Sequence, residues 1–128
     1  MASPISINSR DVLLVIDLQA DFMPGGALAV DGGDEIVPLV NRLASRFEQV
    51  VVTQDWHPPG HVSFASSHEG AKPFETKRLE FGDQVLWRQH CVQRTPGAEL
   101  HPELAVEDRK STRLNSSHRS LSRMPSSA

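Results

Sequence analysis

The sequence predicts an α/β fold with a parallel sheet, and three observations carry this prediction. Asp11–Asp17 is a continuous apolar run between two acids, and Val50–Thr53 is a second, shorter run of the same kind. Continuous rather than alternating apolarity is typical of strands that are buried on both faces of a parallel sheet. The segment between the two runs has apolar residues at helical spacing. One β-α-β unit with a right-handed crossover is therefore expected.

The helix of this unit is expected over about 12 residues, because apolar side chains recur there at intervals of three and four. The break at Gly32-Gly33 precedes it, and Asp34 is a candidate for its N-cap. One face of the helix is then apolar and can pack on the sheet. The residues of that face are Ile36, Val37, Val40, Leu43, Ala44 and Phe47.

Length and charge bound the class of protein. The chain has 128 residues and a net charge of −3, which describes at most one soluble globular domain. This balance favours neither a nucleic-acid nor a membrane partner, and no apolar run approaches the ~20 residues of a membrane span. The start lacks the regions of a secretory signal, and Cys91, the only cysteine, fits a reducing cytoplasm. The oligomeric state stays open.

The loop after the second strand carries a candidate metal site. Asp55, His57 and His61 lie within seven residues there, and a carboxylate with imidazoles is the ligand set that Zn²⁺ prefers. Alternate residues of an extended segment point to one side, so Asp55 and His57 can face one ion. The turn at Pro58-Pro59-Gly60 can bring His61 back toward them. The alternative is a loop with surface histidines and no metal.

Two acids are expected at the same edge of the sheet. Asp17 and Asp55 each close a strand, and ligands of open α/β sheets bind beyond the carboxyl ends of the strands. For Asp17, a turn or cap acid is the alternative to a functional one. His90 is a third candidate imidazole. If it faces the site, its neighbour Cys91 faces away, which favours a buried structural thiol over a nucleophile.

Four blocks of motif residues stand between residues 11 and 104. They resemble the nicotinamidases, which belong to the isochorismatase-like amidohydrolases, and this resemblance implies a three-layer α/β fold. Several blocks in the right order are more specific than one short motif. The blocks read Val15-Ile-Asp17-Leu-Gln-x-Asp-Phe22, Gly25-Gly26-x-Leu-Ala-Val30, Asp55-Trp-His57-Pro-x-x-His61-x-Ser-Phe64, and Trp87-x-x-His90-Cys-Val with Thr95-Pro-Gly-Ala98-x-Leu-His-Pro102.

The resemblance implies a divalent metal ion and a reaction. The reaction is hydrolysis of nicotinamide to nicotinate and ammonia in NAD salvage, with a thiolate attacking the amide carbonyl. Asp55, His57 and His90 match the family's metal ligands, and His61 matches a position that comes near the ion in some members. The donor set suits Zn²⁺ best, and Mn²⁺ or Fe²⁺ also fit.

The resemblance also assigns roles to three other residues. Asp17 matches the acid of the catalytic triad, which takes the proton from the nucleophilic thiol. Phe22 and Trp87 match positions whose aromatic rings line the pyridine pocket.

The second half of the sequence departs from the family pattern. The family also has a lysine shortly after the His-Pro-x-Leu block and a cysteine far downstream. Here Lys110 is the only lysine after that block, and Cys91 matches a non-catalytic cysteine. The 128-residue polypeptide is therefore expected to show little or no turnover. The alternatives are a related amidohydrolase of another small amide and a non-catalytic metal-binding fragment.

The end of the chain also differs in composition. Residues 107–128 contain seven serines and five basic residues, and they have few large apolar side chains. Such a segment buries too little surface to offset the entropy of ordering, so disorder is expected. We therefore expect residues 1–106 to be a truncated isochorismatase-like domain and residues 107–128 to be a disordered tail foreign to the family.

Overall fold

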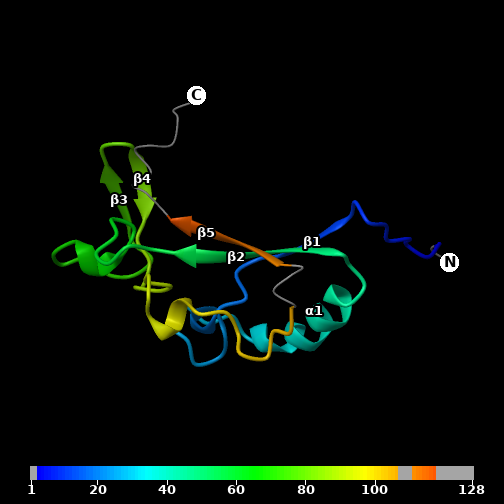
Figure 1. Cartoon of the computed structure of the whole chain (residues 1–128). Coiled ribbons are helices and arrows are strands. Elements are labelled where there is room, and N and C mark those ends of the chain that lie inside the picture. Colours follow the sequence, from blue (N-terminus) through cyan, green and yellow to red (C-terminus); the bar gives the residue numbers. More distant parts are fainter. Residues whose placement is uncertain (1–2, 107–110, 118–128) are drawn as a thin grey trace.

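A parallel sheet of three strands forms the centre of the structure, in the order β1-β2-β5 (Figure 1). The strands are β1 (Val12–Val15), β2 (Gln49–Trp56) and β5 (Ser111–Ser117). Both pairings of β2 are parallel. This computed structural model describes residues 3–106 and 111–117. The predicted α/β class with a parallel sheet is confirmed, while the right-handed sense of the crossover stays a prediction.

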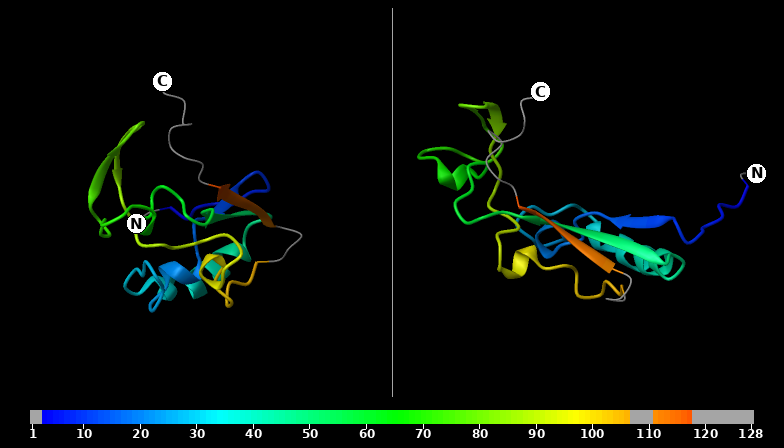
Figure 2. Two further views of the ribbon diagram at one scale, coloured as in Figure 1. Left: turned by 90° about the vertical axis from the view of Figure 1, so that its left-hand side faces the viewer. Right: turned by 45° about the horizontal axis from the view of Figure 1, so that its top comes forward.

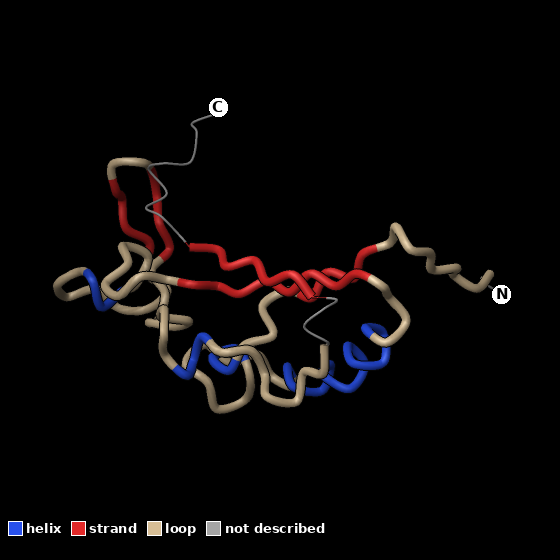
Figure 3. Tube along the Cα trace, viewed as in Figure 1, coloured by secondary structure: helices blue, strands red, loops and turns tan. Residues whose placement is uncertain are grey.

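The helix between β1 and β2 lies on one side of the sheet (Figure 3). It is α1 (Val37–Ala44), and it continues directly from a 3-10 turn at Gly33–Ile36, so the helical stretch has the predicted length. It ends before Phe47, however, and the N-cap of the turn is Gly32 rather than Asp34, which lies inside the turn. Further 3-10 turns lie at Ala20–Phe22, Ala65–Ser67 and Pro96–Ala98. Among the described residues, no helix is long and apolar enough to cross a membrane.

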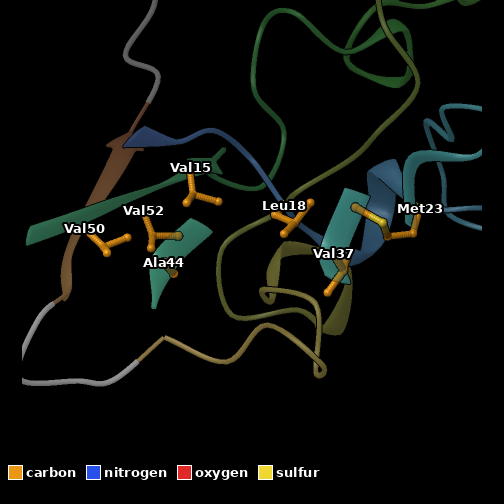
Figure 4. Packing of buried hydrophobic residues seen from close by; sticks show 7 residues of the cluster. All are labelled: Val15, Leu18, Met23, Val37, Ala44, Val50 and Val52. Atoms are coloured by element: carbon orange, nitrogen blue, oxygen red, sulfur yellow. The ribbon is translucent and has the colours of Figure 1, made fainter. Parts of the chain in front are cut away.

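The hydrophobic core fills the space between the sheet and α1. Figure 4 shows its buried side chains, which come from the two strands, the helix and the loop after β1. Leu18 of that loop is 1 % exposed and is among the largest fully buried side chains. Burial of such a side chain stabilises the fold by about 1.5–3 kcal/mol. The residues of the cluster are Val15, Leu18, Met23, Val37, Ala44, Val50 and Val52.

The opposite face of the sheet is open in the part of the chain that the structure describes. Val12, Leu14 and Ile16 are 47 %, 53 % and 64 % exposed, and Leu114 of β5 is 52 % exposed. The sequence predicted strands that are buried on both faces, and for β1 that prediction is wrong. The reason is that the described helical segments near the sheet lie on its other side (Figure 1).

A hairpin stands away from the sheet at one end of the molecule (Figure 2). Its antiparallel strands are β3 (Thr76–Leu79) and β4 (Gly82–Val85). The sequence predicted an irregular surface excursion here. Most of the hairpin's side chains are exposed, so no alternation of apolar and polar residues announced its strands. Gly82, at φ +135°, allows the turn between them.

The serine-rich end of the chain contributes a strand. The expected disorder of residues 107–128 does not hold for Ser111–Ser117, which pair with β2 from Val50 to Trp56. This edge of β2 otherwise presents backbone donors and acceptors, and a parallel strand satisfies them whatever its side chains. Residues 107–110 and 118–128 lie outside the described residues. The division of the chain at residue 106 stays a prediction.

Leu18→Ala should lower the free energy of unfolding by about 2–5 kcal/mol, because it empties space in the core. Leu39→Ala, on the exposed side of α1, is the matched control and should cost about 0.5 kcal/mol or less. Urea denaturation followed by circular dichroism measures both. Equal losses would contradict the core described above.

Candidate metal centre

Three buried side chains converge beyond the carboxyl end of β2. Asp55 is the last residue but one of β2, His57 follows the strand, and His90 arrives from the segment after β4. The Asp55 carboxylate has Oδ1 3.5 Å from His57 Nδ1 and Oδ2 3.3 Å from His90 Nε2. One nitrogen or oxygen from each residue lies within 4.8 Å of the others. The three side chains predicted as ligands thus lie together, and each is buried.

Backbone pairing brings His90 to this place. The His57 N–H donates to the Cys91 carbonyl at 2.8 Å, and the Gln93 N–H donates to the His57 carbonyl at 2.8 Å. His57 and Val92 thereby form a parallel bridge that continues β2 by one step. The residue two positions before Val92 is His90, so this bridge sets its distance from Asp55.

The hydrogen bonds of His90 indicate a positive charge between it and Asp55. A carbonyl oxygen only accepts, so the 2.6 Å contact of His90 Nδ1 with the Arg88 carbonyl places the proton on Nδ1. In the neutral ring, the lone pair of Nε2 then faces an oxygen of Asp55 at 3.3 Å. Two acceptors at this distance need a cation between them, either a proton on Nε2 or a metal ion.

The electrostatics of His90 agree with this reading. Burial disfavours the charged ring, but the hydrogen bonds to Asp55 and to the Arg88 carbonyl and the charges of Asp55 and Asp21 outweigh burial. The pKa of His90 is therefore raised above its ordinary value. A proton and a divalent cation compete for Nε2 of His90, and the negative charge of Asp55 attracts either of them. The residues present fit such an ion.

A cavity of about 350 Å³ opens beside the three side chains. It joins the end of β2 to the hairpin and to the loop after β1. Its size suits a small ring compound rather than a chain molecule. The lining residues are Leu28, Asp55, His57, His61, Ser63, Gln84, Trp87 and His90.

Sequence reasoning assigned no site role to three of the lining residues. Leu28 and Ser63 lie within the blocks that resemble the family, so their position in these blocks could have marked them as site residues. Gln84 belongs to β4 and is 7 % exposed. Nothing in the sequence marked Gln84, because its burial depends on a hairpin that was not predicted.

His61 lies beside the ligand group. Its ring is 5.1 Å from that of His57, measured between centroids, and it is 7 % exposed. Its Nδ1 lies 2.7 Å from Ser63 Oγ and accepts the Ser63 N–H at 3.2 Å. The group of ligand atoms within 4.8 Å, searched over the described residues, consists of Asp55, His57 and His90 without it.

The other residues predicted for the site surround this group at different depths. Asp17 lies just beyond β1 with φ +51°, and its Oδ1 accepts the Thr53 hydroxyl at 2.7 Å. The Phe22 ring is 5.7 Å from the His90 ring. Trp87 lines the cavity and is 37 % exposed. Asp17 and Phe22 are not among the described lining residues, although both approach the same end of the sheet.

Cys91 is a buried thiol rather than a nucleophile facing the cavity. It is 0 % exposed, and its Sγ donates to the Gly97 carbonyl at 3.8 Å. Burial raises the pKa of the Cys91 thiol far above its ordinary value, and the charges of Asp55, Asp21 and Asp17 add to this. A thiol that stays protonated is a poor nucleophile. The structure therefore agrees with the expectation of a structural cysteine.

Comparisons with known proteins identify the family of this chain. Residues 11–119 match the family model described as the isochorismatase domain. The chain is 56 % identical over 92 residues to the nicotinamidase of Acinetobacter baylyi, an alignment that covers 72 % of the chain and 43 % of that protein. It is 51 % identical over 96 residues to the nicotinamidase of Escherichia coli, covering 72 % and 45 %. The chain thus spans less than half the length of these relatives.

Solved structures resemble the same chain. A nicotinamidase/pyrazinamidase of Acinetobacter baumannii superposes with a TM-score of 0.80 at 47 % identity, over 87 % of this chain and 54 % of that one. The pyrazinamidase of Pyrococcus horikoshii, solved in complex with zinc, gives 0.65 at 36 % identity, over 84 % and 52 %. A protein of L. infantum in complex with nicotinate gives 0.67 at 34 %, over 87 % and 50 %.

The native chain should react slowly with a thiol reagent at neutral pH, because Cys91 is buried and its pKa is raised. Unfolding in urea should expose one fast-reacting thiol per chain. The absorbance of the released chromophore measures both rates. Fast reaction of the folded chain would contradict the burial of Cys91.

Proposed function

Because this chain belongs to the isochorismatase family, we propose that its buried centre is part of a nicotinamidase, which hydrolyses nicotinamide to nicotinate and ammonia. One observation carries the proposal: Asp55, His57 and His90 converge beside a cavity of about 350 Å³. The high identity to nicotinamidases supports it. The activity is proposed for the whole protein, since the aligned 92 residues cover only 43 % of the Acinetobacter baylyi relative.

We propose Zn²⁺ as the ion that Asp55, His57 and His90 hold. One carboxylate and two imidazoles form a set that leaves coordination positions open for water or substrate. When bound, such an ion acts as a Lewis acid and as an anchor for the pyridine nitrogen. The zinc complex of the Pyrococcus horikoshii pyrazinamidase supports this choice. Mn²⁺ and Fe²⁺ suit the same donors, and His61 is a candidate for a further contact.

The substrate proposed is a pyridine carboxamide. Trp87 and Leu28 line the cavity with an aromatic and an apolar side chain, and the Phe22 ring lies 5.7 Å from the His90 ring. An apolar pocket with a few polar anchors holds a planar heteroaromatic ring and fixes its orientation. The nicotinate complex of the L. infantum protein supports this substrate class.

Asp17 is proposed as the carboxylate that takes the proton from the nucleophilic thiol during the reaction. The Thr53 hydroxyl holds its Oδ1, and its own N–H donates to Thr53 Oγ1 at 3.0 Å, so the carboxylate is oriented at the end of β1. The attacking thiolate of the family pattern has no match, because the only cysteine is Cys91, which is buried. The lysine has no match either, since Lys110 is the only lysine after the His-Pro-x-Leu block and lies in the segment that departs from the family pattern. We infer that this polypeptide alone turns over little nicotinamide.

The compartment proposed is the cytoplasm. Cys91 is free and buried. A single unpaired thiol is typical of proteins in a reducing environment.

The 128-residue chain should bind one equivalent of Zn²⁺. Asp55→Asn and His90→Gln should each weaken the affinity by more than ~100-fold, because ligands matter more than the residues that orient them. His101→Gln, outside the ligand group, should leave the affinity unchanged. Competition with a chromophoric chelator measures the constants, and equal affinities in all four proteins would refute the metal centre.

A chimera tests the reaction itself. Residues 1–106 joined to the remaining part of the Acinetobacter baylyi nicotinamidase should release ammonia from nicotinamide, whereas the 128-residue chain should not. Asp17→Asn in the chimera should lower kcat/KM by about 10²–10⁴-fold through loss of proton transfer. Asp31→Asn, at an exposed loop position, is the matched control. A folded chimera that binds zinc and releases no ammonia would refute the proposed activity.

A further inference from the structure

Two side chains of the segment after β1 form hydrogen bonds to the backbone at or next to the candidate metal ligands. We propose that Gln19 and Asp21 are positioning residues that hold Asp55 and His90 at the spacing that a divalent ion requires. This inference rests on the proposed metal centre. It concerns residues that do not touch the ion themselves.

Gln19 is bonded to the backbone of Asp55 in both directions. Its side-chain Nε2 donates to the Asp55 carbonyl at 2.9 Å, and its Oε1 accepts the Asp55 N–H at 2.8 Å. Nε2 also donates to the Ala98 carbonyl at 2.8 Å. The side chain is 0 % exposed, so no water competes for these bonds.

The end of β1 explains why such a bond is needed. Val15↔Val52 is the last pair between β1 and β2, so at Asp55 the neighbouring strand has ended. A buried N–H and C=O left without partners would each cost roughly 1–3 kcal/mol. The carboxamide of Gln19 presents one donor and one acceptor, as a peptide group does, and replaces the missing strand residue. Glutamate would lack the donor, and leucine would lack both groups.

Asp21 forms a hydrogen bond to the segment that carries His90. Its Oδ2 accepts the Cys91 N–H at 2.8 Å. Cys91 has φ +47°, a left-handed conformation that is unfavourable for a residue with a side chain. This bond stabilises the turn that directly follows His90. A Cβ atom on Gly97 would collide with the Asp21 carboxylate, so a glycine is needed there to admit it.

Together these bonds hold the backbone of the two ligands in place. Gln19 acts on the backbone of Asp55 itself, and Asp21 acts on the residue next to His90. The imidazole of His90 is fixed separately by the Arg88 carbonyl at 2.6 Å. Groups that orient ligands in this way change metal affinity by about 10–100-fold when they are removed.

The experiment compares four variants of the full 128-residue chain. Gln19→Leu removes the Asp55 contacts, and Asp21→Ala removes the Cys91 contact. Asp21→Asn keeps an acceptor for that N–H. Gln54→Leu is the matched control, because Gln54 is buried and donates to the same Ala98 carbonyl at 3.0 Å. Zn²⁺ affinity by chelator competition, the visible spectrum of bound Co²⁺, and urea unfolding of the metal-free chain are measured for each.

Gln19→Leu and Asp21→Ala should weaken Zn²⁺ binding by about 10–100-fold and shift the Co²⁺ bands. Asp21→Asn should restore most of the affinity, and Gln54→Leu should lose less than ~10-fold at a similar loss of metal-free stability. Equal losses for Gln19→Leu and Gln54→Leu, or for Asp21→Asn and Asp21→Ala, would overturn the proposal.

Three further outcomes are decisive. If Gln19→Leu does not fold, the comparison of Asp21→Asn with Asp21→Ala decides alone, since Asp21→Asn only replaces a carboxylate with a carboxamide of nearly the same shape. If the parent chain binds zinc and every variant binds it equally well, the positioning role fails and the proposed function stands. If the parent chain binds no divalent ion, the metal centre fails and the positioning role fails with it.

Discussion

The parallel bridge between His57 and Val92 is the constraint on which the candidate site depends. It joins segments that lie 35 positions apart, and it is made by two backbone hydrogen bonds of 2.8 Å. Because the bridge continues β2, the ligands are held by sheet hydrogen bonds and are less free to move than the side chains of a loop. A buried carboxylate between two imidazoles is costly without compensation. The backbone pairing of β2 holds these side chains together in spite of that cost, and a bound cation would offset it.

β1 and β2 end at different heights in the sheet, and the site lies where β2 continues beyond β1. β1 stops while β2 continues to Trp56, which leaves room beyond β1 for side chains. Asp17 and Gln19 both occupy that room, and both bond to β2, through Thr53 and Asp55. A site of this kind is thus built from side chains that take the place of a strand. After the apolar run of β1, polar residues that bond to neighbouring backbone or side chains therefore alternate with apolar residues such as Leu18.

The sequence allowed the β-α-β unit and the candidate ligands Asp55 and His57 to be predicted from local pattern, whereas His90 joined the predicted ligand group through the resemblance to the family. Apolar runs marked the strands, and parallel strands must deliver Asp17 and Asp55 to one edge. The hairpin was missed because its side chains face solvent, and β5 was missed because backbone pairing overrode a serine-rich composition. The contacts of Gln19 could not be foreseen, since they depend on where β1 stops.

The open face of the sheet affects how this chain unfolds. Leu14 and Ile16 are mostly in water before unfolding begins, so their hydration changes little in the transition. The heat capacity change of unfolding and the slope of its free energy against denaturant both scale with newly exposed surface. Both quantities should therefore be smaller than for a chain of this length whose sheet is covered on both faces, and the curve of stability against temperature should be flatter.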